Sequence, residues 1–171
     1  TSYYWEIESA YKYQENKTIK GIYYITYELD GGNNSTKNPT KIYDDESIIL
    51  YDASKTGYTF AAWYLDSEKT TPITKLENVV NNTTLYADYT PISYVINYHL
   101  FNGNNPVKNP SEYTIEDEIT LKDANKTGYT FNGWYTNAEL TKSISSISNR
   151  IGDIELYAKF TPNSYYYSFN D

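Results

Sequence analysis

Apolar and polar residues alternate along several short stretches of the chain, the pattern of a half-buried β-strand. In segment 23–29 every second residue is apolar or aromatic, and segment 94–100 repeats this alternation. Glycine- and asparagine-rich segments follow at 30–34 and 102–105. These residues tolerate positive φ angles, so each of the two predicted strands should end in a turn.

Further strands are predicted on the same grounds, and each has a counterpart later in the chain. They are short strands at 48–50 and 119–121, aromatic strands at 58–65 and 129–136, and closing strands at 85–89 and 156–160. In the first aromatic strand Trp63 is out of phase with Tyr58 and Phe60. This predicts either a β-bulge that redirects Trp63 or a strand that is buried on both faces.

One helix is also predicted in each half. In segment 73–80, Ile73, Leu76 and Val80 would share one side of a short helix, and apolar residues have the same spacing in segment 144–151. A Thr-Pro pair follows each predicted closing strand, at 90–91 and 161–162. Proline has no N–H to donate to a strand ladder, so the closing strands should end there.

The elements recur because the chain contains an internal repeat with an offset of 71 residues. Aligning residues 22–91 with 93–162 needs no gap and gives roughly 31 identities in 70 positions. We therefore predict a strand-like leader at 1–21, a first repeat at 22–91, a second repeat at 92–162, and a C-terminal strand at 163–171 that begins an incomplete third repeat. Residues 164–169 support the last element, because they align with the first strand of the second repeat.

Composition narrows the range of functions. The chain has 22 tyrosines, 18% aromatic residues and a net charge of -8. So many aromatic residues are untypical of a disordered chain, and the negative charge argues against nucleic acid as a partner.

The absence of cysteine and the presence of a single histidine, His99, limit the possible chemistry. Disulfides and thiolate chemistry are excluded, and acid–base catalysis is disfavoured. No apolar stretch is long enough to span a membrane. The chain begins at Thr1 without methionine, so we expect a mature form or an excised piece.

The ordered motifs of both repeats resemble the Listeria–Bacteroides repeat, the B-repeat unit of internalin-type surface proteins. The resemblance covers about four fifths of the chain. It differs at Ala62, where the family usually has glycine, and at 101–103, which replaces a double glycine. The segments that carry the resemblance are 25–32, 37–39, 57–64 and 85–87 in the first repeat, and 102–103, 128–131, 133–135 and 156–160 in the second.

The resemblance implies a β-rich α+β fold made of two tandem β-grasp-like (ubiquitin-like) repeats, which here carry extra terminal strands. It also implies an extracellular location on a bacterial cell surface, and it brings no catalytic residues. We therefore expect a non-enzymatic module with no cofactor, which acts as an adhesin stalk or spacer and as a protein-interaction scaffold. Its partners would be neighbouring repeats or subunits bound through strand edges, or a host or community surface protein or glycan.

Several candidate sites have simpler interpretations. His99 lies on the polar face of its predicted strand, with no second base or nucleophile nearby in the pattern. The acidic segments 44–46 and 116–118 lack the spaced aspartates and the glycine of a calcium loop, so solvated turns are favoured. Asp52 and Asp123 recur in phase among turn-forming residues and predict local bonds to the backbone.

Two further possibilities concern lysines and the ends of the chain. Lys37 and Lys55 are available for an isopeptide crosslink to asparagine, which sequence cannot place. Aromatic residues concentrate in the leader and in the tail, where docking onto neighbouring modules is favoured over sugar binding. Two alternative functions follow, namely a subunit of an extracellular fibre that is assembled by terminal strand addition, and a carbohydrate-binding module. The residues concerned are Tyr3, Tyr4, Trp5, Tyr11, Tyr13, Tyr165, Tyr166, Tyr167 and Phe169.

Overall fold

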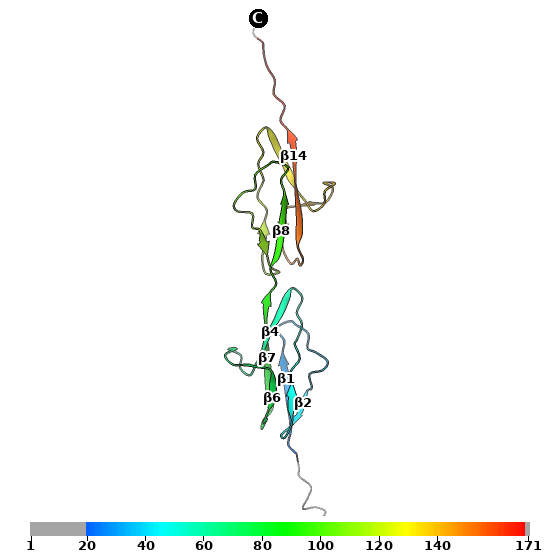
Figure 1. The fold of residues 1–171 in the computed structure, drawn as a ribbon, viewed down its shortest axis with the longest axis vertical. Helices are drawn as coiled ribbons and strands as arrows, with labels where there is room; N and C mark the ends of the chain where they lie inside the picture. The colour runs from blue at the N-terminus through cyan, green and yellow to red at the C-terminus, as the bar shows by residue number, and fades with distance from the viewer. Residues whose placement is uncertain (1–19, 170–171) are drawn as a thin grey trace, which may run out of the picture. The chain divides into compact units, whose positions relative to one another are not determined.

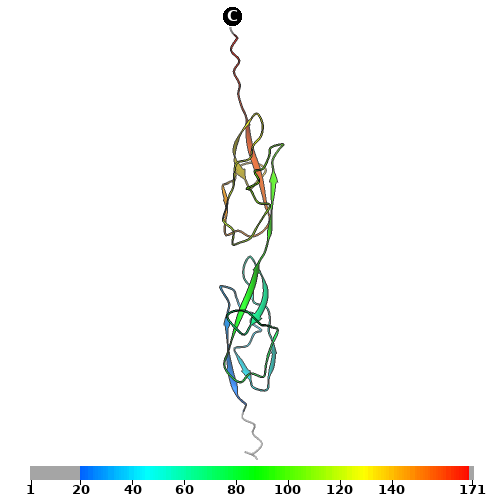
Figure 2. The ribbon, with the colours of Figure 1, turned by 90° about the vertical axis from the view of Figure 1, so that its left-hand side faces the viewer.

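The computed structural model describes residues 20–169. They form two compact units (Figures 1 and 2). One unit contains the described residues up to Thr56 together with Phe60–Tyr89, and the other contains Gly57–Thr59 together with the residues from Thr90 onward. All regular structure in the described residues is β-strand. The expectation of β-rich repeats is therefore confirmed at the level of fold class.

The first unit has a mixed five-stranded sheet in the order β2-β1-β7-β4-β5 and a separate two-stranded sheet that pairs β3 with β6. Its strands are β1 Ile22–Glu28, β2 Lys41–Tyr43, β3 Ser47–Ile49, β4 Tyr58–Tyr64, β5 Pro72–Ile73, β6 Lys75–Glu77 and β7 Thr83–Pro91. The strands β1 and β7, at the two ends of the unit's sequence, are parallel neighbours, in register from Ile25↔Thr83 to Glu28↔Tyr86.

The second unit repeats this arrangement, with a five-stranded sheet in the order β12-β11-β14-β8-β9 and a small sheet of β10 and β13. Again the first and last strands are parallel neighbours, here from Ile154↔Ile96 to Tyr157↔His99. The strands are β8 Tyr94–His99, β9 Glu112–Tyr113, β10 Ile119–Thr120, β11 Tyr129–Tyr135, β12 Ser143–Ile144, β13 Ser146–Ile147 and β14 Ile154–Pro162.

Each core is built around one tryptophan. Trp63 and Trp134 are 1% and 2% exposed and lie in separate clusters of buried apolar residues. In the first unit the ring of Tyr27 packs edge-on against Trp63 at 5.3 Å and 66°, and Tyr98 packs against Trp134 at the same distance and angle. Such edge-to-face contacts are a favoured geometry for aromatic rings. This tyrosine–tryptophan contact is therefore the same in the two cores.

The recurring Lys-Asn-Pro motif supplies a buried asparagine to each core. Asn38 donates to the Tyr51 carbonyl at 2.8 Å and accepts from the Tyr51 N–H at 2.8 Å, and the Trp63 indole N–H donates to the same carbonyl at 2.9 Å. In the second unit Asn109 and Trp134 make the corresponding three bonds to Lys122. A buried polar group is tolerated only when it is hydrogen-bonded, so these motif residues serve the fold.

In each unit the carbonyl of the proline in the same motif accepts a hydrogen bond from a tyrosine hydroxyl. The Tyr27 hydroxyl donates to the Pro39 carbonyl at 2.7 Å, and the Tyr98 hydroxyl donates to the Pro110 carbonyl at 2.8 Å. Burial raises the pKa of Tyr27 to about 12, and burial raises that of Tyr98 to about 12 as well. Both hydroxyls thus stay protonated donors under ordinary conditions.

The predicted helices are wrong. Segment 73–80 contains the end of β5 and the strand β6, and segment 144–151 contains the end of β12 and the strand β13. Leu76 and Val79 are buried, whereas Val80 is 69% exposed, so the apolar residues do not share a helical stripe. Because the described residues contain no helix, the α+β class is corrected to all-β, and the β-grasp description is not supported.

Residues 163–169 form no strand in the structure, and their assignment as the first strand of an incomplete third repeat stays a prediction. The strand that this segment resembles, β8, is held between β9 and β14. A strand needs neighbours to pair its N–H and C=O groups, and residues 20–169 offer the tail none. The predicted N-terminal strand, Tyr3 to Tyr13, lies outside the described residues.

The remaining strand predictions are confirmed to within a residue or two. A register shift between Phe131 and Trp134 in the pairing of β11 with β14 is the irregularity that the out-of-phase tryptophan predicted. The edge strands β2 and β9 were not predicted, although Ile42 is fully buried and Tyr113 is 2% exposed. Each has too few residues to show an alternating pattern.

Candidate functional site

The central strands of each unit carry a polar face on the side away from the core. Burial alternates along β1 and β7, with Ile25, Leu85 and Ala87 buried and the residues between them exposed or half-buried. We call the side with the polar residues the outer face. It is formed by Thr26, Glu28, Thr84, Tyr86 and Asp88 in the first unit, and by Asn97, His99, Glu155, Tyr157 and Lys159 in the second.

On the outer face of the second unit the polar side chains contact one another. The His99 ring stacks on Tyr157 with centroids 4.2 Å apart and an interplanar angle of 8°. His99 Nε2 and Glu155 Oε2 are 2.5 Å apart, and the Asn97 amide donates to the same carboxylate at 2.8 Å. These hydrogen bonds, that of His99 foremost, lower the pKa of Glu155. The ammonium of Lys159 lies 5.4 Å from the centre of the Tyr135 ring.

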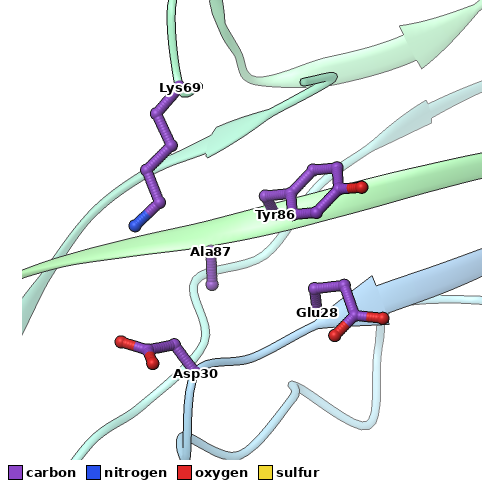
Figure 3. Close-up of a pocket in the computed structure, with 5 residues that line it drawn as sticks. All are labelled: Glu28, Asp30, Lys69, Tyr86 and Ala87. Atoms are coloured by element: carbon purple, nitrogen blue, oxygen red, sulfur yellow. The ribbon is translucent and has the colours of Figure 1, made fainter. Parts of the chain in front are cut away.

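The outer face of the first unit instead forms an open cleft of about 430 Å³. Figure 3 shows Glu28 and Tyr86 projecting from neighbouring strands, with Lys69 and Asp30 beside them. Lys69 pairs with Asp88 at 2.6 Å. Residues 20–169 provide neither an ion pair to Glu28 nor a ring or cation stacked on Tyr86.

A lysine at the rim of each outer face holds the turn after the first strand. Lys55 binds the Asp30 carboxylate at 3.0 Å, and this hydrogen bond is the main cause that lowers the pKa of Asp30. In the second unit Phe101 replaces Asp30, and Lys126 donates to the Phe101 carbonyl at 2.7 Å instead. The lysine therefore holds this turn in both units, but the second unit has no carboxylate at the position of Asp30.

The structure places His99 on the polar face, as predicted, where it contacts Glu155 and Tyr157.

The acidic segments 44–46 and 116–118 form hydrogen bonds within their own turns. Glu46 accepts from the Tyr43 N–H at 3.0 Å, and Asp117 accepts from the Thr114 N–H at 2.7 Å. Within residues 20–169 no cluster of three or more carboxylate or histidine side chains is arranged to hold a metal ion.

The other sequence candidates have different outcomes. Within the described residues Asp52 and Asp123 are exposed and make no side-chain hydrogen bond, so the predicted local bonds are wrong. The Lys37 ammonium lies 4.9 Å from the centre of the Tyr51 ring, and that of Lys55 lies on Asp30. The tail aromatics are strongly exposed, and the leader aromatics lie outside the described residues; the exposed tail residues are Tyr165, Tyr166, Tyr167 and Phe169.

The sequence predicts the polar face for His99 but not the residues that surround it there, because the identities between the repeats mark core residues. The sequence does contain one indication of this site, because equivalent residues on one face of the sheet carry opposite charge or lose it between the two copies. Glu28 corresponds to His99 and Asp88 to Lys159 at the offset of 71, while Tyr86 and Tyr157 are the same residue.

The family assignment rests on this repeated arrangement and on a direct comparison. The profile of the Listeria-Bacteroides repeat domain matches residues 23–88 and again residues 94–159. This chain belongs to the Listeria-Bacteroides repeat family. In these two family repeats the shared motifs build the core, as the bonds of Asn38 and Asn109 show.

A relative of these Listeria-Bacteroides repeats has a name that refers to a membrane. It is the "Putative Gly-rich membrane protein" of Evansella cellulosilytica, which is 27% identical over 173 residues. The alignment covers 96% of this chain and 20% of the relative, so the chain spans about a fifth of that protein. No solved structure matches significantly. In the part of the chain that the structure describes, no helix is long and apolar enough to cross a membrane.

Proposed function

We propose that the chain is a spacer and interaction scaffold of a bacterial cell-surface protein, in which the repeats separate another domain from the cell surface. Family membership and the membrane-protein relative support the surface location. One structural observation carries the spacer role. In each unit the first and last strands are parallel neighbours, β1 beside β7 and β8 beside β14.

This pairing determines where the chain enters and leaves a unit. In the first unit the chain enters at Ile22, runs to Glu28, and later returns through Thr83 in the same direction to leave at Pro91. Parallel strands start at the same end of the sheet and finish at the same end. Entry and exit therefore lie at opposite ends of the pair, so each repeat adds length to the protein instead of folding back.

The same pairing favours resistance to pulling. Tension applied through the chain draws β1 and β7 past each other, so the hydrogen bonds between Ile25↔Thr83 and Glu28↔Tyr86 are strained together. A pair that is pulled from one end would lose its bonds one after another. The last strand is also flanked on its other side by β4, which holds it within the sheet.

Single-molecule pulling tests this proposal. The chain has no cysteine, so engineered cysteines provide unique handles. Handles at Lys20 and Thr90 load the β1–β7 pair along the strands, whereas handles at Lys20 and Asn81 peel it from one end. We expect a clearly higher unfolding force in the first geometry. Equal forces would contradict the mechanical role.

The surface location needs a separate test. Antibodies against residues 22–162 should label intact cells of the organism that encodes the chain, and protease added outside the cells should remove the label. An in-frame deletion of these residues should bring an epitope on the following or preceding domain closer to the wall and reduce its labelling. Signal found only after lysis would contradict the surface role.

The fibre alternative finds less support than the spacer. In both complete units the first strand already has neighbours on both sides, β2 and β7 or β9 and β14, so the tail finds no vacant central position there. The edge strand β5 has two residues and begins with Pro72, which lacks an N–H. Short edge strands and proline both oppose strand addition.

A further inference from the structure

The same position on the outer face is filled in one unit and open in the other. His99 lies beside Tyr157 in the sheet register and covers its ring, with 4.2 Å between centroids. Glu28 lies beside Tyr86 in the equivalent register. Its carboxylate cannot stack as an imidazole does, and the Tyr86 ring borders the cleft. The first unit thus has the tyrosine but lacks the planar group that covers it in the second.

The second unit also shows what chemistry suits this position. The group over Tyr157 is a flat ring whose nitrogen faces a carboxylate, that of Glu155. In the first unit Thr84 replaces Glu155, and the carboxylate is supplied by Glu28. A ligand that completes the first unit should therefore be planar, carry N–H donors and be positively charged.

Neither Lys69, which lines the cleft, nor Lys55, which binds the cleft residue Asp30, meets this description. Lys69 is engaged by Asp88 at 2.6 Å, and Lys55 by Asp30 at 3.0 Å. An ammonium is a compact point charge without a flat face, whereas a guanidinium is planar, bonds a carboxylate with two N–H groups and stacks on aromatic rings. Glu28 thus remains as the carboxylate for an incoming group.

We propose that Glu28 and Tyr86 bind an arginine side chain of a partner protein, with the guanidinium stacked on Tyr86 and hydrogen-bonded to Glu28. The proposal rests on the interaction-scaffold part of the proposed function. The net charge of -8 favours a basic partner, because opposite charges steer association. A single exposed contact of this kind is weak, so the partner would present several basic residues or several copies.

Nuclear magnetic resonance titration with N-acetyl-arginine amide tests the proposal on the full chain. We expect concentration-dependent shifts of the Glu28 backbone amide and the Tyr86 ring, and these shifts should become smaller as salt is added. N-acetyl-lysine amide should bind about fivefold more weakly, because it lacks the stacking contact. The corresponding signals of His99 and Tyr157 should stay unchanged.

Exchanging the two outer faces provides matched variants. Glu28→His should close the first site by placing an imidazole over Tyr86, and Glu28→Gln should weaken binding by removing the charge. The double variant His99→Glu with Glu155→Thr gives the second unit the residues of the first at these positions, and it should create a new site at Tyr157. Unchanged signals from Trp63 and Trp134 would show that both cores remain folded.

Three results would overturn the proposal: no concentration-dependent shift at Glu28 and Tyr86, equal binding by Glu28→His, or no new site in the double variant. A methyl glycoside that shifts Tyr86 more than the arginine amide does would instead assign the cleft to sugars. These readouts are independent of the pulling force. A chain that resists pulling without binding arginine would keep the spacer role and lose this site.

Discussion

Residues 28 and 99 occupy equivalent positions, yet their surroundings differ. Each lies beside a tyrosine on the strand that comes last in the sequence of its unit, β7 or β14. In the second unit His99, Glu155 and Tyr157 contact one another, so the outer face is occupied by its own side chains. In the first unit Glu28 and Tyr86 border an open cleft. The difference shows that one fold can present either a closed or an open surface through a few exchanges outside the core.

The interiors show the opposite behaviour. Asn38 and Asn109 make equivalent bonds, and the tyrosine–tryptophan contacts have the same distance and angle in both units. A core change must keep packing and every buried hydrogen bond satisfied, whereas a change on the outer face alters only groups that water can solvate. The family motifs therefore identify the fold, and any binding specificity has to be sought in residues that differ between repeats.

The largest expected effect tests the equivalence of the interiors. Trp63→Ala and Trp134→Ala should each lower the free energy of unfolding of their own unit by about 3–5 kcal/mol, since each removes a buried ring and leaves a cavity. Hydrogen exchange followed by mass spectrometry can report each unit separately. If one substitution were tolerated and the other not, the two cores would not be equivalent.

A smaller effect is expected at the buried asparagines. Asn38→Ala leaves the Tyr51 N–H without its acceptor, while the Tyr51 carbonyl keeps its bond from Trp63. The same change removes the donor to Asn34 Oδ1, and a polar group left unsatisfied in this part-buried region costs up to about 1–3 kcal/mol. Denaturant unfolding of Asn38→Ala and Asn109→Ala should show similar losses. As a control, Asp52→Ala on the exposed surface should change stability little.

Alkaline pH should affect both units alike. Burial raises the pKa of Tyr27 and Tyr98 to about 12, above the ordinary value near 10. A raised pKa means that the folded state holds its proton more tightly, so this stability is present below pH 10 and is lost as the pH rises toward 12. Unfolding midpoints should fall over this range, and less steeply in Tyr27→Phe with Tyr98→Phe. The same fall in this variant would rule out these hydroxyls as the cause.

The smallest effect should separate the two outer faces. His99 lowers the pKa of Glu155, so this contribution to stability is present above the carboxyl's ordinary value and is lost as the pH falls. The first unit has Thr84 at the equivalent position and lacks this titration. A carbon-13 titration should find a higher Glu155 pKa in His99→Gln than in the unchanged chain. Equal values would show that the two side chains do not interact in solution.

Periodicity and the repeat predicted most of the strands from sequence, and the bulge considered for Trp63 has its counterpart in the register shift between Phe131 and Trp134 of the second unit. The helices failed because Ile73, Leu76 and Val80 fit a helical spacing by coincidence. In the structure Ile73 and Leu76 belong to two different short strands, and tertiary pairing overrides the local pattern. A helix and two short strands cannot be distinguished by so few apolar residues.

The candidate site was less predictable than the fold. Glu28 and Tyr86 are 58 positions apart in sequence and meet only through the parallel pairing of β1 with β7. Alternation predicts the polar face for His99, and Glu28 has the equivalent position in the first repeat, but alternation gives no information on the neighbouring strand. The sequence shows that His99 replaces Glu28 in the second repeat. The effect of this replacement becomes clear only in the structure, where each residue lies beside a tyrosine of the neighbouring strand.

The central place of the last strand has a consequence for synthesis on the ribosome. Until Thr83–Pro91 has left the exit tunnel, β1 and β4 both lack the neighbour that joins them, so a nascent repeat stays open in the middle of its sheet. The following repeat brings β14, which carries the same Leu-Tyr-Ala sequence as β7 and would fit the same gap. Differences between successive copies, such as Thr83 against Ile154, would then help each repeat to close on its own final strand.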